Sequence, residues 1–221
     1  MRIAALETAT DACSVAVYRE GEILERFEVT PRRHTQRILP MLKSLLAEAG
    51  LKLQDLDALA FGRGPGAFTC VRIAAGVVQG LALGTGLPVV PVSTLAALAR
   101  EGFAHSDAEY ALAALDARMG EVYWGMYRRG LEEGLEVLVA PEQVSVPESG
   151  TCIGIGPGWQ GYGEVLRSRL KEGQLVGVWP ERLPRAAWVA QLAAEKLAKG
   201  EVVAPAEALP VYLRDRVAEK V

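Results

Sequence analysis

Gly62-Arg63-Gly64-Pro65-Gly66 and Gly154-Ile155-Gly156-Pro157-Gly158 are two copies of one five-residue turn, and they decide the fold of this chain. Each copy follows a short apolar run, residues 59–61 or residues 151–153, and each opens a segment with helical periodicity. Such a repeat indicates that the chain consists of one structural unit built twice.

A second repeat supports the first. Glu7 begins a turn that leads to Tyr18, and Asp116 begins one that leads to Tyr127, so the carboxylate precedes the tyrosine by 11 residues in both halves. In each half the acidic turn comes first and the glycine turn second. Two different repeats in the same order favour a duplication over chance.

Hydrophobic periodicity predicts the element order βββαβαβα in both halves. The expected strands are 3–6, 13–18, 22–29, 58–62 and 89–92, then 110–115, 121–128, 135–139, 151–155 and 175–178. The expected helices are 38–49 (interrupted or kinked at Pro40, capped by Gly50), 67–84, 94–100, 162–170 and 185–199, with a short helical turn at 141–146.

This order is typical of a duplicated α/β fold with two actin-like lobes (the ASKHA, ribonuclease H-like architecture), each a mixed sheet with flanking helices. The predicted lobes are residues 1–103 and 104–204. Residues 205–221 are expected to join the first lobe, because Leu209, Tyr212, Leu213 and Val217 form an amphipathic pattern.

Composition narrows the functional classes. The 221 residues carry a net charge of −3, which gives the chain as a whole no attraction for nucleic acid. The N-terminus lacks the apolar core of a signal peptide, and three scattered cysteines, Cys13, Cys70 and Cys152, suit the core of a cytoplasmic protein. The apolar segment 68–87 contains Arg72 and Gln79, so we interpret it as a buried helix and expect no membrane span.

The two acidic turns are candidate nucleotide sites. In actin-like folds the first hairpin of each lobe contacts phosphate and a carboxylate holds the metal ion, which points to Glu7 and Asp116. The alternative is that both acids only accept hydrogen bonds from turn amides. The glycine turns likewise present backbone N–H groups to an anion or serve close packing alone. The candidate phosphate contacts are Glu7, Thr8, Thr10, Gly64, Gly66 and Asp116.

A stripe of glycines marks the helix after the first glycine turn. Gly76, Gly80 and Gly84 lie four residues apart and leave one helix face without side chains, although each glycine costs about 1 kcal/mol of helix propensity. Close approach of another backbone explains them, either within the lobe or from another protein. The preceding helix adds Leu39, Met41 and Leu45, which we expect to be exposed.

Catalytic motifs are scarce. The chain has two histidines, no HExxH and no GxSxG. It therefore lacks the sequence motifs of these metal-dependent hydrolases and of hydrolases with a catalytic triad. His34 lies beside Arg32, Arg33 and Arg37, a cluster that suits a phosphate contact or a solvated helix start.

Several motifs resemble the bacterial TsaB (YeaZ) family over essentially the whole chain. They are Glu7-Thr-Ala-Thr10 with Ala12-Cys-Ser-Val15, His34 with Ile38-Leu-Pro40, Gly64-Pro-Gly-Ala-Phe-Thr69 with Val71-Arg-Ile-Ala74, Asp116-Ala-Arg-Met119 with Glu121-Val-Tyr123, and Pro210-Val-Tyr-Leu-Arg214. The family carries Asp where this chain has Glu7, and Ser and Gly at Ala67 and Cys70, which weakens any transfer of nucleotide contacts.

The resemblance implies a non-catalytic partner of TsaD, the homologous enzyme that transfers threonylcarbamoyl to an adenosine beside the tRNA anticodon, together with a TsaE-like ATPase. TsaD-like relatives bind their metal with a Val-Asn-His-x-x-x-His stretch, whereas this chain has Val92-Ser93-Thr94-Leu95-Ala96-Ala97-Leu98. Thr94 and Leu98 therefore stand where the histidines would be. We expect no metal, no cofactor and no catalytic residue in this chain.

The expected interface with the TsaD-like partner uses the first two helices of the N-terminal lobe. A homodimer is plausible when the chain is alone, and tRNA contact is at most indirect. The alternatives are an ATP-dependent kinase or phosphatase using Glu7 and Asp116, and a metallopeptidase. The expected interface residues are Leu39, Met41, Leu42, Leu45, Arg72, Ala75, Gly76, Gln79 and Gly80.

Overall fold

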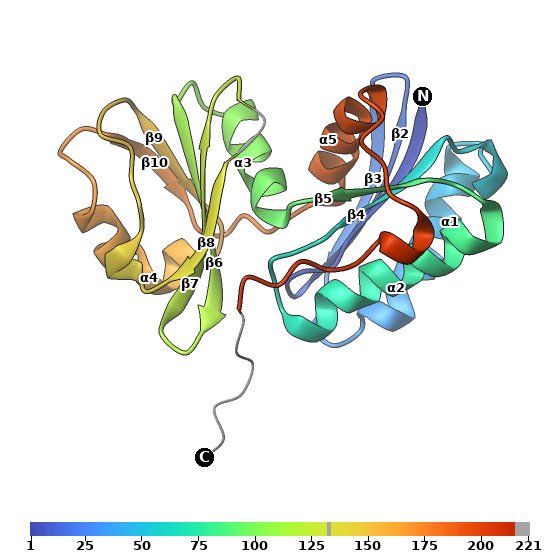
Figure 1. Ribbon diagram of the computed structural model, residues 1–221, viewed down its shortest axis with the longest axis horizontal. Coiled ribbons are helices and arrows are strands. Elements are labelled where there is room, and N and C mark those ends of the chain that lie inside the picture. Colours follow the sequence, from blue (N-terminus) through green and yellow to red (C-terminus); the bar gives the residue numbers. More distant parts are fainter. Residues whose placement is uncertain (132–133, 215–221) are drawn as a thin grey trace, which may run out of the picture. The chain divides into compact units, whose positions relative to one another are not determined.

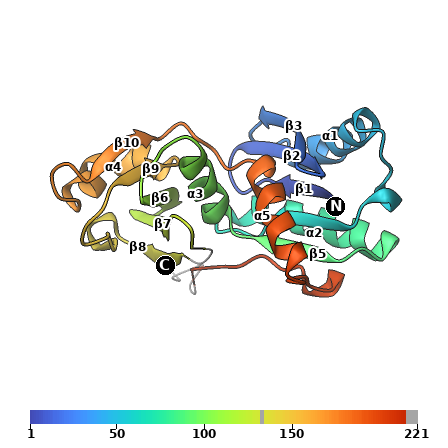
Figure 2. The same cartoon turned by 90° about the horizontal axis from the view of Figure 1, so that it is seen from above.

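The computed structural model describes residues 1–131 and 134–214. Within them the chain forms two compact units, each built on a five-stranded sheet (Figures 1 and 2). Unit 1 comprises Met1–Ala97 and Leu183–Pro210. Unit 2 comprises Leu98–Arg182 and, among the described residues of the tail, Val211–Arg214.

The two sheets have the same topology, which confirms the duplication. Unit 1 has the strand order β3-β2-β1-β4-β5, and unit 2 has the corresponding order β8-β7-β6-β9-β10. In each sheet the first three strands pair antiparallel and the last two add in parallel. The strands are β1 (Arg2–Glu7), β2 (Ala12–Arg19), β3 (Glu22–Val29), β4 (Ala58–Gly62), β5 (Val89–Val92), β6 (Tyr110–Arg118), β7 (Glu121–Arg128), β8 (Leu135–Val139), β9 (Cys152–Ile155) and β10 (Leu175–Trp179).

The helices lie close to the predicted segments. They are α1 (His34–Glu48), α2 (Phe68–Thr85), α3 (Thr94–Ala104), α4 (Gly158–Ser168) and α5 (Ala186–Ala198), with 3₁₀ turns η1 (Leu53–Asp55), η2 (Pro141–Gln143) and η3 (Pro205–Glu207). α1 runs through Pro40, whose ring is exposed, so the helix starts earlier than the proline suggested. Gly50 follows α1 in the left-handed region at φ +67°, as its predicted capping role requires.

Unit 1 has a core on each face of its sheet, because successive strand residues point to opposite faces. On β1, Ala4 and Leu6 pack with the buried faces of α1 and α2, whereas Ile3 and Ala5 pack against α5. Figures 1 and 2 show this three-layer arrangement, with α1 and α2 on one side of the sheet and α5 on the other.

The unit boundaries differ from the predicted lobes because two helices cross over. α5 follows the second sheet in sequence, yet its alanine-rich face, including Ala186, Ala190 and Ala193, packs on the first sheet. Most of α3 belongs to unit 2, where a Cβ at Gly102 would lie 3.3 Å from Ile153. Residues 104–204 therefore do not form one unit.

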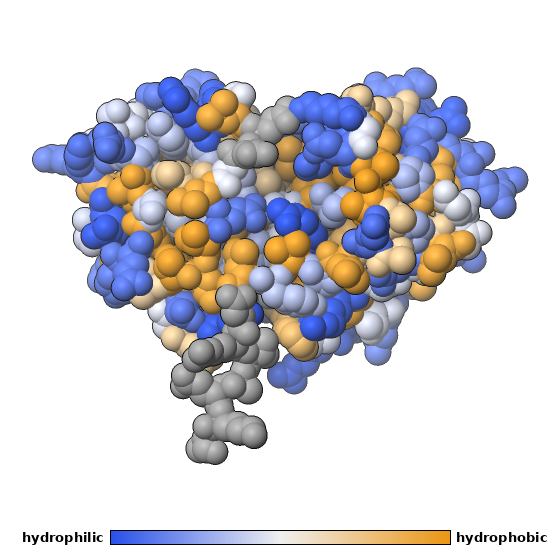
Figure 3. Space-filling view, in the orientation of Figure 1, coloured by the Kyte–Doolittle hydropathy of each residue, from blue (hydrophilic) through white to orange (hydrophobic). Residues whose placement is uncertain are grey.

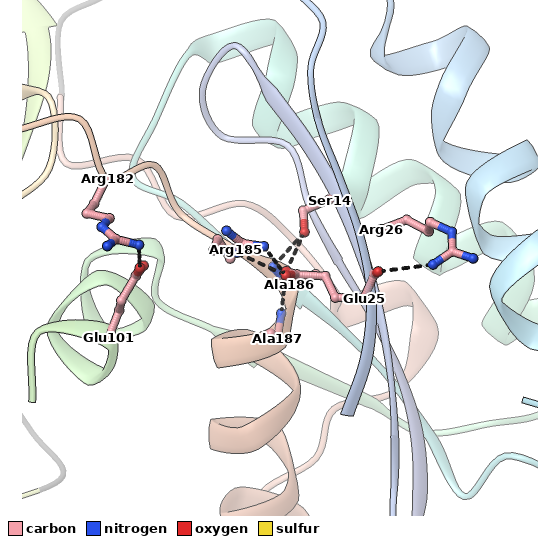
Figure 4. Close-up of polar contacts among 8 residues, drawn as sticks. All are labelled: Ser14, Glu25, Arg26, Glu101, Arg182, Arg185, Ala186 and Ala187. Carbon is pink, nitrogen blue, oxygen red and sulfur yellow. Dashed lines mark hydrogen bonds and ion pairs between the residues drawn. The ribbon is translucent and has the colours of Figure 1, made fainter. Parts of the chain in front are cut away.

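The start of α5 is held by a polar network from β2 and β3 (Figure 4). The Glu25 carboxylate accepts hydrogen bonds from the Ala187 N–H at 3.0 Å and from Arg185 at 2.9 and 2.6 Å. Ser14 Oγ donates to Glu25 at 2.8 Å and accepts from the Ala186 N–H at 3.0 Å. Glu25 thus acts as a remote N-cap for a helix that is distant in sequence.

The described part of the C-terminal segment, up to Arg214, has contacts in unit 1 and then in unit 2. Val203 bridges to Val89 on β5, and Ala208 is fully buried in the first core. Leu209 and Tyr212 are 59% and 43% exposed, so neither side chain is buried in the way that the amphipathic pattern predicted. In unit 2, Arg214 donates to Ala117 O at 3.1 Å and pairs with Glu121 at 2.7 Å. Val217, in the predicted pattern, lies outside the described residues.

Candidate functional site

In the first acidic turn, the Glu7 side chain is buried and accepts hydrogen bonds from groups of unit 1. This side chain is 1% exposed, and its Oε1 accepts the Ala9 N–H at 2.6 Å while Oε2 accepts the Thr94 hydroxyl at 3.2 Å. Burial raises the pKa of Glu7 to about 7, against the lowering effect of hydrogen bonds from Ala9, Thr94 and Thr8. Both oxygens of the Glu7 carboxylate therefore accept hydrogen bonds from groups of this chain.

The glycine turn fits tightly against this carboxylate. A Cβ at Gly62 would lie 1.9 Å from Glu7 Oε2, and a Cβ at Gly66 would lie 2.6 Å from both Ala9 Cβ and Ala9 O. Gly64 has φ +97°, and its carbonyl accepts the Thr94 N–H at 3.0 Å. The geometry favours close packing as the role of these glycines.

The glycine turn of the second half is also closely packed, but against Ala114 instead of a carboxylate. A Cβ at Gly156 would lie 2.5 Å from Ala114 O, and one at Gly158 would lie 2.8 Å from Ala114 Cβ. Asp116 Oδ1 accepts the Arg118 N–H at 2.8 Å, and Oδ2 pairs with the Arg118 guanidinium at 3.1 Å. Asp116 therefore accepts a hydrogen bond from an amide of its own turn. This is the alternative to a nucleotide contact that the sequence left open.

The other candidate groups also have structural partners. Thr8 is buried and donates to Cys70 O at 2.6 Å, while Thr10 Oγ1 accepts the Ala12 N–H at 3.3 Å. His34 is buried, with Nε2 3.1 Å from Ala12 O, so it is not part of a solvated phosphate cluster. Within residues 1–131 and 134–214, no three His, Cys, Asp or Glu side chains are grouped to hold a metal ion.

The environment of the three cysteines disfavours the reactive thiolate form. Cys13 and Cys152 are buried, and burial raises the pKa of each thiol to about 11. Cys70 is half-buried, and burial raises its pKa as well.

One face of α2 is not covered by the rest of unit 1. Val71, Ala74, Val78 and Ala82 face the core, but Phe68 and Leu83 are 51% and 70% exposed. α2 is long and apolar enough to cross a membrane, with a mean hydropathy of 1.4. Within the structure, 28% of its residues are buried. The prediction of a buried helix is therefore wrong for the outer face of α2, whereas the inner face packs in the core of unit 1.

The glycine stripe lies on the exposed face of α2. Gly76, Gly80 and Gly84 are exposed, and a Cβ at any of them would meet no atom within 4 Å. The interpretation that the stripe packs within its own lobe is therefore wrong. Arg72 is exposed on the same stripe, one turn before Gly76, and Gln79 is half-buried beside Gly80.

α1 contributes less to this surface than its sequence suggested. Leu39 is 48% exposed as expected, but Met41 and Leu45 are 4% and 0% exposed. Leu42 and Ala75, also predicted at the interface, are buried in the same core. α1 crosses both β2 and α2, so more of its circumference is covered than one sheet could cover.

Two parts of the exposed apolar surface were missed in the sequence. Phe68 and Leu83 lie near the two ends of the glycine stripe. Phe68 is eight residues before Gly76 and Leu83 is seven residues after it, and this helical spacing could have placed both on the exposed face. Val202 and Leu209, 38% and 59% exposed, lie on the segment beside α2, which no local pattern indicates. Figure 3 shows hydrophobic residues at the surface over this part of unit 1.

A family model and several curated proteins match the sequence of this chain. A family model for TsaD, tRNA N6-adenosine threonylcarbamoyltransferase, matches residues 27–150. The chain is 44% identical over its full length to the tRNA threonylcarbamoyladenosine biosynthesis protein TsaB of Escherichia coli (strain K12), covering 97% of it. The corresponding Haemophilus influenzae TsaB is 38% identical, with 96% of it covered.

A solved structure of YeaZ from Pseudomonas aeruginosa is 48% identical to this chain. It superposes with a TM-score of 0.88, covering 96% of this chain and 99% of that one. Sequence identity over the full length and the superposition on YeaZ lead to one assignment. The chain belongs to the TsaB (YeaZ) family of tRNA threonylcarbamoyladenosine biosynthesis proteins.

Proposed function

We propose that this chain is a non-catalytic subunit of the threonylcarbamoyladenosine synthesis complex and that it binds and activates a TsaD-like transferase. The observation that carries the proposal is the exposed glycine stripe of α2, with open space at Gly76, Gly80 and Gly84. Exposed glycines lower helix stability without any gain inside this unit. They become favourable when a second helix packs against them.

The chemistry of the α2 surface suits another protein as its occupant. Helices pack with axes 8–10 Å apart, and glycines at the contact permit the close end of that range. Among the exposed residues of α2, Arg72 is the one charged side chain, and apolar Phe68 and Leu83 are exposed with it. Covering this surface removes apolar area from water with little cost for burying charge.

A homologous partner explains why the surface lies on α1 and α2. The TsaD family model matches residues 27–150, which include both helices, so a TsaD-like partner carries the corresponding helix pair. Two related surfaces can then pair around a pseudo-two-fold axis, as in isologous dimers. A homodimer through the same surface is the expected alternative state when the partner is absent.

The remaining roles in the proposed complex fall to other subunits. Glu7 and Asp116 accept hydrogen bonds from their own turns, so an ATP-dependent kinase or phosphatase using them is not favoured. A metallopeptidase is not favoured either, because Thr94 and Leu98 are not metal ligands of the expected type. A TsaE-like ATPase is the proposed third component, tRNA contact is at most indirect, and the cytoplasm is the expected location.

Gly80→Arg tests the interface directly. Because a Cβ at Gly80 meets no atom within 4 Å, we expect the variant to keep its circular dichroism spectrum and melting temperature. We expect its affinity for a purified TsaD-like partner to fall at least 100-fold, because the arginine separates the helices and must be desolvated. Isothermal titration calorimetry measures this affinity.

Gly161→Arg on α4 is the matched control. Gly161 is an exposed helical glycine with nothing within 4 Å, but it lies in unit 2. We expect wild-type affinity from this variant. Equal affinities of the two variants for the partner would contradict the α2 interface, and size-exclusion chromatography of each chain alone would report any homodimer on the same surface.

A further inference from the structure

α2 has no N-terminal cap of its own. Its N-cap residue is Ala67, which provides no side-chain hydrogen bond, and its first turn contains no acidic residue. The first N–H groups of a helix need partners from outside the helix, and an uncapped start frays. The position of the first turn of α2 therefore depends on neighbouring segments.

The β1–β2 turn accepts one of these N–H groups and makes a second hydrogen bond to a carbonyl of the first turn. Ala9 O accepts the Ala67 N–H at 2.8 Å, and the Thr8 hydroxyl donates to Cys70 O at 2.6 Å. Gly66 packs against Ala9 so closely that a Cβ would lie 2.6 Å from its carbonyl oxygen. The start of α2 is thus held by two residues of the turn, Thr8 and Ala9.

Glu7 in turn holds the β1–β2 turn. Its carboxylate accepts the Ala9 N–H and the Thr94 hydroxyl, so it joins the turn to the residue that begins α3. The Thr94 N–H donates to Gly64 O, which ties the same point to the glycine turn that leads into α2. One buried carboxylate therefore connects both segments that precede α2.

We propose that Glu7 is a positioning residue for the partner-docking surface, acting through Ala9 and Thr8 on the first turn of α2. The inference rests on the proposed function of α2 as the docking surface. The groups that it positions are Phe68 and Arg72, whose guanidinium carbon lies 3.3 Å from the Phe68 ring centroid and whose Nη1 donates to Phe68 O at 2.9 Å. This pair moves with the first turn of α2 as one group.

Hydrogen exchange tests the positioning without any partner. In Glu7→Ala we expect amides 67–72 to exchange at least tenfold faster than in the wild type, while amides 78–85, at the other end of α2, change less than twofold. Thr8→Val removes the hydroxyl contact with Cys70 but keeps Glu7, and we expect several-fold faster exchange in the same amides. This second variant keeps the test valid if Glu7→Ala does not fold.

Two further variants separate positioning from general stability. Glu25→Ala disrupts a half-buried carboxylate network of unit 1 at the start of α5, and we expect no change in amides 67–72. Glu7→Gln retains an oxygen for the Ala9 N–H, and we expect it to restore exchange to within about threefold of the wild type. Uniformly faster exchange along α2 in Glu7→Ala would overturn the inference.

Partner affinity provides the second readout. At a temperature where all variants are folded, we expect Glu7→Ala to bind the TsaD-like partner about tenfold more weakly, and Glu7→Gln and Glu25→Ala to bind like the wild type. Wild-type affinity in Glu7→Ala would overturn the inference. If the wild-type chain does not bind the partner, the proposed function fails, and the exchange experiment still decides whether Glu7 positions α2.

Discussion

At the scale of single residues, Glu7 couples a buried charge to the fold of unit 1. Its pKa is raised from 4.5 to about 7, so the folded state binds this proton more tightly than the unfolded state does. The associated stabilisation is fully present below pH 4.5 and is lost as the pH rises through 7. The loss is on the order of 3 kcal/mol.

Glu7→Gln removes this titration while keeping the size of the side chain. We expect the unfolding free energy of the wild type to fall relative to that of Glu7→Gln between about pH 5 and pH 7, and the difference to stay constant above about pH 8. Urea unfolding at a series of pH values, followed by circular dichroism, measures both curves. Parallel curves for the two proteins would mean that Glu7 keeps an ordinary pKa in the folded state.

Gly62 and Glu7 are predicted to be energetically coupled. Gly62→Ala places a methyl group on the buried carboxylate, and we expect a cost of about 1–3 kcal/mol from overpacking. In a Glu7→Ala background the same change should cost less than about 1 kcal/mol, because the space is then vacant. A double-mutant cycle of unfolding free energies gives the coupling. Additive effects would show that the loop relaxes away from the carboxylate.

The sequence identified Glu7 as a special residue but not what it does. Its position before a turn and the duplication were visible, and both pointed to nucleotide chemistry. Its hydrogen bond to Thr94 joins residues 87 positions apart, and only the parallel pairing of β1, β4 and β5 brings them together. Local patterns report turns, whereas the partner of a buried polar group depends on the tertiary fold.

At the scale of elements, the sequence predicted the bounds of α2 but not which of its faces is exposed. Periodicity located the helix, and the glycine stripe raised two alternatives that sequence could not separate. The open space at Gly80 decides against packing within the unit. On α1, Met41 and Leu45 were expected to be exposed because one sheet covers one face, but α1 also packs against α2, so both residues are buried.

α5 provides an element-scale prediction. Its first turn depends on Glu25, a carboxylate 160 residues away from Arg185 in sequence. We expect Glu25→Ala to lower the unfolding free energy by about 1–3 kcal/mol, through loss of the remote cap and of the Arg185 contacts. Glu22→Ala, on the same strand but exposed, should change it by less than about 0.5 kcal/mol. Urea unfolding compares the two, and equal effects would contradict the capping role.

At the scale of the whole molecule, duplication was predictable and the exchange of helices was not. The glycine turns recur because each half needs the same strand-to-helix geometry, and the acidic turns recur because each half begins with an antiparallel hairpin; both are recorded locally in the sequence. α5 joins the first sheet and most of α3 the second, because small residues such as Ala190 and Gly102 fit closely against sheets that are not adjacent in sequence. No local pattern indicates which sheet a small-faced helix will cover.

The last prediction concerns activity of the assembled complex. Alone, this chain should transfer no threonylcarbamoyl group to tRNA, because its two candidate carboxylates, Glu7 and Asp116, are engaged within their own turns. A TsaD-like transferase with a TsaE-like ATPase but without this chain should show less than about a tenth of the activity of the full set. Binding at α2 can raise activity only by favouring a competent state of the partner.

A reconstitution assay with purified components, each omitted in turn, measures these activities by mass spectrometry of digested tRNA. Gly80→Arg should behave like omission of the chain, and Gly161→Arg like the wild type, because the proposed effect passes through α2 alone. Restored activity at high concentrations of Gly80→Arg would locate its defect in affinity. Full activity without the chain, or turnover by the chain alone, would show that its contribution is not activation through binding.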